Sequence, residues 1–298
     1  MIAARLNMRF PGERVKAVTL SYDDQSEQDI KLVEILNKNG MKATFNISTG
    51  LYSSEGKQFN KGQICRRMTR QRAIELYKNS GHEVAVHGYS HSFLTQMPVS
   101  SVNREVFTDR INLESDFETD VRGMAYPFGD SSYSEEVANA VKACGIVYSR
   151  MTSSTKNFML PTDWYRWYPT CKHQSACLME LAEKFLADTT NKEPKLFYLW
   201  GHSFEFDMDG NWNVIENFCE LMGNRDDVWY ATNIEIYDYV QAYKRLVWTA
   251  DMRRVYNPSA ISVSFQYHTI EDSKEIKRTY SVGAGETLVL TQGTEAEF

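Results

Sequence analysis

Residues 15–24 have the sequence VKAVTLSYDD, and this stretch decides the fold. Its apolar and β-branched side chains are typical of a buried β-strand, and it ends in two adjacent acids, Asp23 and Asp24. A later apolar run ends in HGYSH, which places His87 and His91 four residues apart. Two acids and two imidazoles that follow predicted strands provide the side chains of a mononuclear metal site, with one carboxylate left over as a base.

Outward from this stretch, short runs of β-branched and aromatic residues alternate with amphipathic helical stretches. The expected strands are residues 15–22, 42–47, 82–86, 123–126, 145–149, 195–200 and 228–231. The expected helices are residues 28–39, 70–80, 102–117, 134–143, 176–188, 212–222 and 234–246. This alternation predicts an α/β fold, a distorted (β/α) barrel of about seven parallel strands, with a doubly wound sheet as the alternative.

The pattern changes after about residue 250, where predicted strands follow one another without helices between them. The expected strands are residues 260–267, 275–281 and 287–290. So short a segment holds little core of its own, so we expect it to pack on the barrel. The predicted domains are therefore the barrel, residues 1–250, and a small C-terminal β appendage, residues 251–298.

The composition is typical of a globular protein, with 42% hydrophobic and 24% charged residues and a formal net charge of −6. The negative charge argues against nucleic-acid and anionic-membrane partners, which attract basic surfaces. No stretch reaches the ~18 apolar residues of a membrane span. The N-terminus lacks the apolar core of a signal peptide, and the five cysteines have no regular spacing, so we expect reduced thiols and a cytoplasmic protein. A signal peptide already removed is left open, as is the oligomeric state.

Candidate functional residues follow the carboxyl ends of most predicted strands, the edge where β/α barrels build active sites. These residues are Asp23, Asp24, His87, His91, Tyr126, Phe128, Arg150 and His202. Two imidazoles and one carboxylate around a divalent ion leave positions open for water and substrate. Such an ion lowers the pKa of a bound water toward ~7, the second carboxylate can accept its proton, and His202 can protonate the leaving group. The implied reaction is hydrolysis of an amide or ester, with Tyr126 and Phe128 near the substrate and backbone N–H groups near Phe128 facing the oxyanion.

The motifs around these residues resemble those of the polysaccharide deacetylases, also called carbohydrate esterase family 4 or the chitooligosaccharide deacetylase homology domain. The family's Thr-Phe-Asp-Asp-Gly is similar to SYDDQ at 21–25, and its His-Ser/Thr-x-x-His is similar to HGYSH at 87–91. Its Arg-x-Pro-Tyr-Gly is similar to AYPFG at 125–129, and its Leu-x-His is similar to LWGH at 199–202, with one extra residue. The resemblance covers roughly residues 15 to 245.

The resemblance implies a role for each residue of the predicted site. Asp23 would be the base, His202 the acid, and Asp24, His87 and His91 the metal ligands. It also implies an N- or O-acetylated saccharide as the substrate. The expected cofactor is a divalent metal, for which zinc is favoured, although cobalt, nickel and iron accept the same ligands.

The sequence departs from the family motifs at three positions. Gln25 replaces a glycine, which can alter the turn or narrow the entrance, and Gly88 replaces a serine or threonine. Ala125 stands where the family has an arginine that orients the base. We hypothesise, from position alone, that Arg150 or Arg166 supplies this charge from elsewhere in the chain.

Two other functions remain compatible with these residues. The same site could hydrolyse a small non-sugar amide. Alternatively, Ala125 and Gln25 could leave a non-catalytic protein that keeps the metal and binds carbohydrate. The presence of both Asp23 and His202 argues against this second alternative, because a binding-only site needs neither a base nor an acid.

Overall fold

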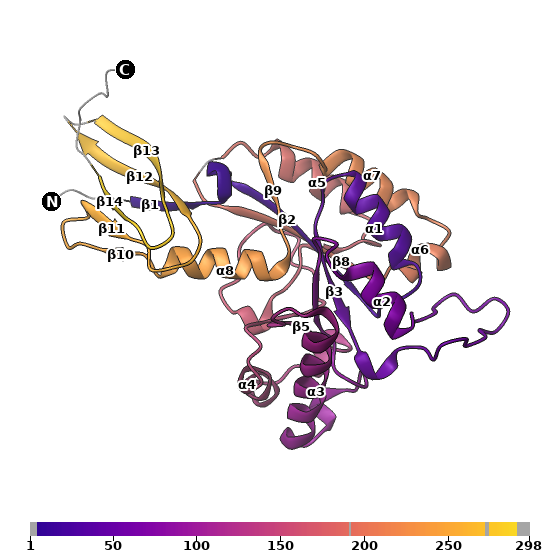
Figure 1. Cartoon of the computed structure of the whole chain (residues 1–298). Coiled ribbons are helices and arrows are strands. Elements are labelled where there is room, and N and C mark those ends of the chain that lie inside the picture. The colour runs from indigo at the N-terminus through magenta and orange to yellow at the C-terminus, as the bar shows by residue number, and fades with distance from the viewer. Residues whose placement is uncertain (1–4, 191, 272–273, 291–298) are drawn as a thin grey trace.

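A computed structural model describes residues 5–190, 192–271 and 274–290 of the chain. Its centre is an eight-stranded sheet in which every strand pair is parallel, in the order β6-β5-β4-β3-β2-β8-β7, with β9 beside β2. The strands are β2 (Lys16–Asp23), β3 (Ala43–Ile47), β4 (Glu83–Val86), β5 (Gly123–Ala125), β6 (Tyr148–Arg150), β7 (Cys171–Lys172), β8 (Lys195–Gly201) and β9 (Val228–Tyr230). The predicted α/β fold with a parallel sheet is confirmed (Figure 1).

Strand β2 is the centre of this sheet, and all eight of its residues are buried. On one side it pairs with β8 along residues 16–22. On the other side, its first half pairs with β9 and its second half pairs with β3. Strands that are covered on both faces are continuously apolar, which explains why this stretch of sequence is so distinctive.

The two edges of the sheet are linked by the segment 167–172. The N–H of Trp167 donates to the carbonyl of Ser149, next to β6, at 3.1 Å, and its own carbonyl accepts from Met151. A few residues later, β7 pairs with β8 at the opposite edge. The sheet therefore curls into a distorted barrel, and its carboxyl ends converge. The strand β7 was not predicted, because two residues form no recognisable apolar run.

Helices flank the barrel sheet (Figure 1). They are α1 (Asp29–Lys38), α2 (Arg70–Tyr77), α3 (Val99–Phe117), α4 (Glu135–Ala143), α5 (Leu178–Ala187), α6 (Phe204–Met208), α7 (Asn213–Met222) and α8 (Asn233–Lys244). Short 3₁₀ turns are η1 (Pro11–Glu13), η2 (Thr49–Leu51), η3 (Leu94–Gln96), η4 (Gly129–Ser132) and η5 (Trp164–Arg166). Seven helices match predicted ones, and α3 begins three residues before its predicted start. The five-residue α6 was not predicted.

Two small antiparallel sheets form the appendage, as the sequence predicts in outline. One contains β10 (Val247–Trp248), β11 (Arg254–Tyr256) and β14 (Thr287–Val289). The other contains β1 (Arg5–Arg9), β12 (Val263–Glu271) and β13 (Lys274–Val282). Strand β1 pairs with β12, so residues 5–9, which were predicted to belong to the barrel domain, lie in one sheet with C-terminal strands. Chain segments far apart in sequence therefore build this sheet together.

The appendage packs on the barrel through α8 (Figure 1). The hydroxyl of Tyr239, on α8, donates to the carbonyl of Arg9 at 2.7 Å and accepts from the N–H of Ser264 at 2.9 Å. Phe10 is completely buried, with its ring centre 5.5 Å from that of Trp229 and 6.3 Å from that of Tyr239.

Among the described helices, none has both the length and the apolar character that crossing a membrane requires.

We expect Phe10→Ala to destabilise the protein by about 3–5 kcal/mol, because it removes a buried aromatic side chain and leaves a cavity between barrel and appendage. Urea denaturation measures the change. Phe107→Ala is the matched control, because Phe107 is 52% exposed and its loss should cost less than about 0.5 kcal/mol. Equal effects of the two substitutions would contradict the packing described above.

Candidate active site and metal centre

A cleft of about 560 Å³ lies at the carboxyl ends of the barrel strands. It is lined by Asp23, Asp24, His87, His91, Tyr126, Phe128, Gly129, Thr152, Lys172, Trp200 and His202. The residues predicted as base, acid and metal ligands thus all line one cleft, although they come from segments up to about 180 positions apart in the chain.

Asp24, His87 and His91 form a group that can hold a metal ion, since their ligand atoms all lie within 4.8 Å of one another. Nδ1 of His87 donates to the carbonyl of Ala125 at 2.8 Å, which leaves the lone pair of Nε2 for a metal. Burial lowers the pKa of His87 to about 4 and also lowers that of His91, so both rings stay neutral near pH 7. Neutral imidazoles and a carboxylate are the forms that bind a divalent metal. The side chains therefore fit such an ion.

The carboxylate of Asp24 is also held by Arg67, a residue that the sequence did not identify. Nη2 of Arg67 donates to Oδ1 of Asp24 at 2.6 Å, and Nη1 donates to Oε1 of Gln25 at 3.3 Å. Gln25 bonds through its side chain to both backbone groups of Ser48, at 2.9 and 3.2 Å. The side chain of Gln25 therefore points into the protein and does not line the cleft, so it does not narrow the entrance. Asp24 and Gln25 have φ angles of 81° and 37°, so this turn is strained for residues with a side chain.

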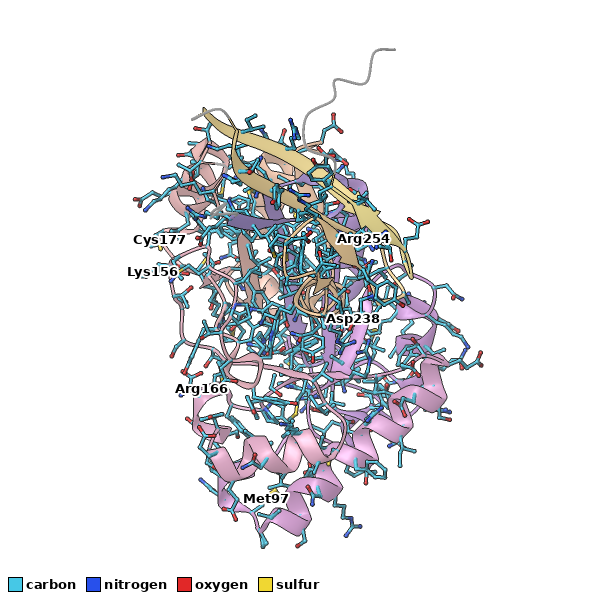
Figure 2. All side chains as sticks on the ribbon, turned by 90° about the vertical axis from the view of Figure 1, so that its left-hand side faces the viewer. Met97, Lys156, Arg166, Cys177, Asp238 and Arg254 are labelled. Atoms are coloured by element: carbon cyan, nitrogen blue, oxygen red, sulfur yellow. The ribbon has the colours of Figure 1, made fainter. Side chains whose placement is uncertain are left out.

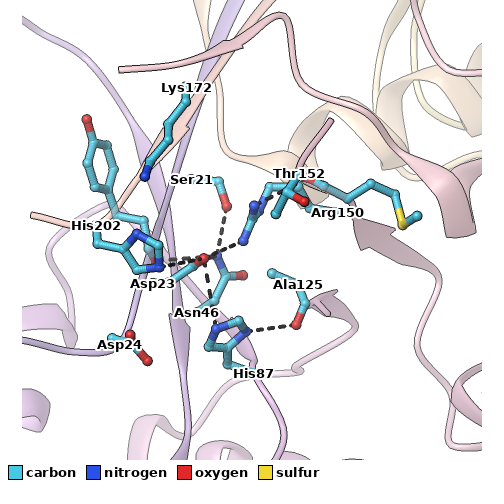
Figure 3. Close-up of polar contacts among 12 residues, drawn as sticks. Ser21, Asp23, Asp24, Asn46, His87, Ala125, Arg150, Thr152, Lys172 and His202 are labelled. Atoms are coloured by element: carbon cyan, nitrogen blue, oxygen red, sulfur yellow. Dashed lines mark hydrogen bonds and ion pairs between the residues drawn. The ribbon is translucent and has the colours of Figure 1, made fainter. Parts of the chain in front are cut away.

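Asp23 is buried and surrounded by groups that stabilise its charge (Figure 3). Nη2 of Arg150 donates to Oδ2 at 2.5 Å, and Nδ2 of Asn46 donates to Oδ1 at 2.8 Å. Nε2 of His87 and Nε2 of His202 lie 3.9 and 3.7 Å from Oδ2. Burial alone would raise the pKa of Asp23, but Arg150, the two histidines and Asn46 together lower it below its ordinary value. Asp23 is therefore an ionised carboxylate that could accept a proton.

Arg150 places a guanidinium beside Asp23, although position 125 is an alanine. Arg150 on β6 is the direct register partner of Ala125 on β5, and paired residues of neighbouring strands point to the same face of a sheet. The guanidinium is completely buried, 4.5 Å from the ring centre of Trp200. Arg166 does not contact Asp23: its Nε donates to Asp163 at 2.9 Å. Figure 2 shows Arg166 at the edge of the molecule, so only Arg150 has the geometry expected of a base-orienting residue.

His202 lies at the other side of Asp23, where β8 ends. Its Nδ1 is 3.3 Å from Oε2 of Glu205, and its Nε2 points toward Asp23 at 3.7 Å. Burial lowers the pKa of His202, but Glu205 and Asp23 raise it more, and the result is a pKa above the ordinary value. A raised pKa favours the protonated ring, which is the form that can donate a proton.

The segment around Phe128 provides one free backbone donor. The N–H of Tyr126 donates to the carbonyl of Arg150 at 3.2 Å and so cannot face an oxyanion, although the residue lines the cleft. Among the described residues, the N–H of Phe128 has no acceptor. The ring of Phe128 stacks on Phe93 at 3.7 Å and lies edge-on to the ring of His91 at 4.6 Å. Phe128 is therefore the stronger of the two oxyanion candidates.

Several residues of the site were not predicted. Asn46 could have been found, since it is a polar residue near the end of the strand predicted over 42–47. Arg67 lies in an irregular segment before α2, and Lys172 lies in the two-residue β7. Neither has a sequence signal that would bring it to the cleft.

Comparisons with known proteins give one matching family and several similar folds. The polysaccharide deacetylase family model matches residues 12–149. No curated protein matches the sequence. A similar solved structure is a putative polysaccharide deacetylase from Mycobacterium smegmatis, with 15% identity and a TM-score of 0.54 over 82% of this chain and 96% of that chain. At this identity the likeness concerns the fold.

Two further solved structures are less similar. One is a family 4 carbohydrate esterase from Streptomyces lividans in complex with acetate, with 13% identity and a TM-score of 0.46 over 70% of this chain and 87% of that chain. The other is a CE4 family pseudoenzyme from Bacillus anthracis, with 14% identity and a TM-score of 0.45 over 77% of this chain and 67% of that chain.

We expect His91→Ala to weaken zinc binding by more than the 10–100-fold typical for loss of a residue that only supports a ligand, because it removes a ligand itself. Equilibrium dialysis followed by elemental analysis measures the bound ion. His268→Gln is the control, since His268 lies in the appendage sheet and should leave binding unchanged. Unchanged zinc affinity in His91→Ala would refute the assignment of this ligand.

Proposed function

Residues 12–149 match the polysaccharide deacetylase family model, and on that premise we propose that the chain is a metal-dependent hydrolase of this family that removes acetyl groups from an N- or O-acetylated saccharide. The observation that supports this most is the environment of Asp23. Its carboxylate lies beside the metal-ligand group without belonging to it and is bonded to Arg150 and Asn46. A buried, ionised carboxylate beside the metal ligands is what a general base for a metal-bound water requires.

The chain's own residues have distinct tasks in the proposed reaction. When bound by Asp24, His87 and His91, a divalent ion supplies Lewis-acid chemistry: it acidifies a water molecule and polarises the acyl carbonyl. Asp23 accepts the proton of the attacking water. His202, whose Nε2 is 3.7 Å from Asp23, donates a proton to the departing nitrogen or oxygen of the sugar.

Other groups orient the substrate and the base. The free N–H of Phe128 faces the oxygen on which negative charge develops, a role in which one donor contributes about 3–4 kcal/mol. Arg150 and Asn46 each bind one oxygen of Asp23, so the carboxylate cannot rotate away from the cleft. Zinc is our proposal for the ion, because two imidazoles and one carboxylate with an open position are a common catalytic zinc site.

The test is acetate release by the zinc-loaded protein from N-acetylglucosamine oligomers, O-acetylated xylan and a panel of small acetamides. Asp23→Asn should lower kcat about 10²–10⁴-fold, the usual contribution of a general base, while the bound zinc is retained. Removal of zinc by a chelator should abolish activity, and zinc should restore it. Arg166→Ala is the control and should behave like the wild type, because Arg166 pairs with Asp163 at the surface.

Each alternative function has its own outcome in this test. Acetate from small amides but from no sugar would contradict the saccharide substrate and support the small-amide hydrolase. A zinc-bound protein that releases no acetate from any substrate would contradict the enzyme and support a carbohydrate-binding protein. Equal activity of Asp23→Asn and wild type would remove Asp23 as the base.

A further inference from the structure

Glu205, on α6, is the centre of a buried cluster of charged and polar side chains beside the cleft. Its Oε1 accepts from Nζ of Lys172 at 2.6 Å. Its Oε2 lies 3.2 Å from Nε2 of His173 and 3.3 Å from Nδ1 of His202. The backbone N–H of His202 also donates to Oε2 at 3.2 Å. One carboxylate is thus fixed by Lys172 on one oxygen and shared by two imidazoles on the other.

The backbone around this cluster is shaped to admit His173. A Cβ on Gly201 would lie 2.0 Å from Nδ1 of His173, so this imidazole occupies the space of a missing side chain. Gly201 lies one position before His202 in the LWGH motif, which has one residue more than the family's Leu-x-His. The ring of His173 is buried between Tyr22 and Phe206, at 5.7 and 4.2 Å between ring centres. The absence of a side chain at Gly201 is therefore what allows the imidazole of His173 to lie here.

The buried carboxylate of Glu205 is stable only when its charged and polar partners are all present. A carboxylate as buried as Glu205, which is 7% exposed, loses several kcal/mol of hydration unless charged or polar partners replace the water. Lys172 provides the opposite charge, and its Nζ is further placed by Trp200, whose ring centre is 5.3 Å away. With Oε1 taken by Lys172, Oε2 is the oxygen left for the imidazoles.

We propose that Lys172 and His173 are positioning residues for His202, because they hold the carboxylate of Glu205 against Nδ1 of His202 and leave Nε2 facing the cleft. The inference rests on the proposed function, in which His202 protonates the leaving group. Without Lys172 or His173, Glu205 can rotate toward other partners, and Nδ1 of His202 loses the carboxylate oxygen that lies 3.3 Å away. His202 then adopts other ring orientations and protonation states.

Acidic side chains face His202 from two elements. Asp23 and Asp24 face it from the end of β2, and Glu205 faces it from α6. Lys172 and His173, at the end of β7, act on it through Glu205. The two aspartates stay unchanged in the variants below, so their effect on His202 is the same in all of them.

The first experiment is independent of turnover. In the zinc-loaded, ¹⁵N-labelled protein, the nitrogen spectrum of His202 should show a protonated, hydrogen-bonded Nδ1, assigned by its loss in His202→Gln. Lys172→Met and His173→Gln should each lose this signature. Lys172→Arg should retain it, because arginine keeps a donor and a charge. Lys184→Met, which removes an exposed lysine from α5, is the matched charge control. An unchanged Nδ1 signal in both Lys172→Met and His173→Gln would overturn the inference.

The second experiment uses substrates that differ in their need for a general acid. Lys172→Met and His173→Gln should lower kcat on the N-acetylated sugar by about 10–100-fold, part of the usual contribution of a general acid, with little change in KM. On 4-nitrophenyl acetate, whose leaving group needs no proton, kcat should fall less than about 3-fold. Equal losses on both substrates would overturn the inference, because a merely structural role affects both alike. A wild type without turnover on either substrate would refute the proposed function, and the Nδ1 signal would still decide the inference.

Discussion

The buried ion pair between Asp23 and Arg150 is the interaction on which the rest of the site depends. Removing a carboxylate and a guanidinium from water costs several kcal/mol for each ion, so such a pair persists only with close geometry and further partners. Asn46 takes the second oxygen of Asp23, and Trp200 covers the guanidinium. The pair also joins β2 to β6, which β3, β4 and β5 separate in the sheet. This contact across the interior is possible only because the sheet curls.

The sequence was sufficient to predict most of the barrel, and the reason is burial. Strands such as β2 are covered on both faces and are therefore continuous apolar runs, which alternate with amphipathic helices. The elements that were missed, β1, β7, β10, β11 and α6, have two to five residues each. Such short elements are fixed by tertiary contacts and not by local pattern, and the pairing of β1 with β12 spans almost the whole chain.

The residues of the candidate site also differ in whether the sequence could predict them. Residues directly after predicted strands, such as Asp24, His87 and His202, could be placed on one edge of the sheet from topology alone. The choice between Arg150 and Arg166 could not be made, because it depends on the register that pairs Arg150 with Ala125. Arg67, the partner of Asp24, lies in an irregular segment, and Lys172, a partner of Glu205, lies in the two-residue β7, so no periodicity predicts the position of either residue. Sequence thus predicted most of the residues that line the cleft, and the structure adds the groups that hold them in place.

The most direct test of this account is the free energy of unfolding of an arginine swap, measured by urea denaturation. Arg150→Ala should cost about 3–5 kcal/mol, because it leaves Asp23 as an unpaired buried charge. The double variant Ala125→Arg/Arg150→Ala returns an arginine to the paired position of the neighbouring strand and should recover more than half of that loss. If Arg150→Ala costs no more than the surface variant Arg166→Ala, or if the second arginine recovers nothing, the Asp23–Arg150 pair is not the constraint described here.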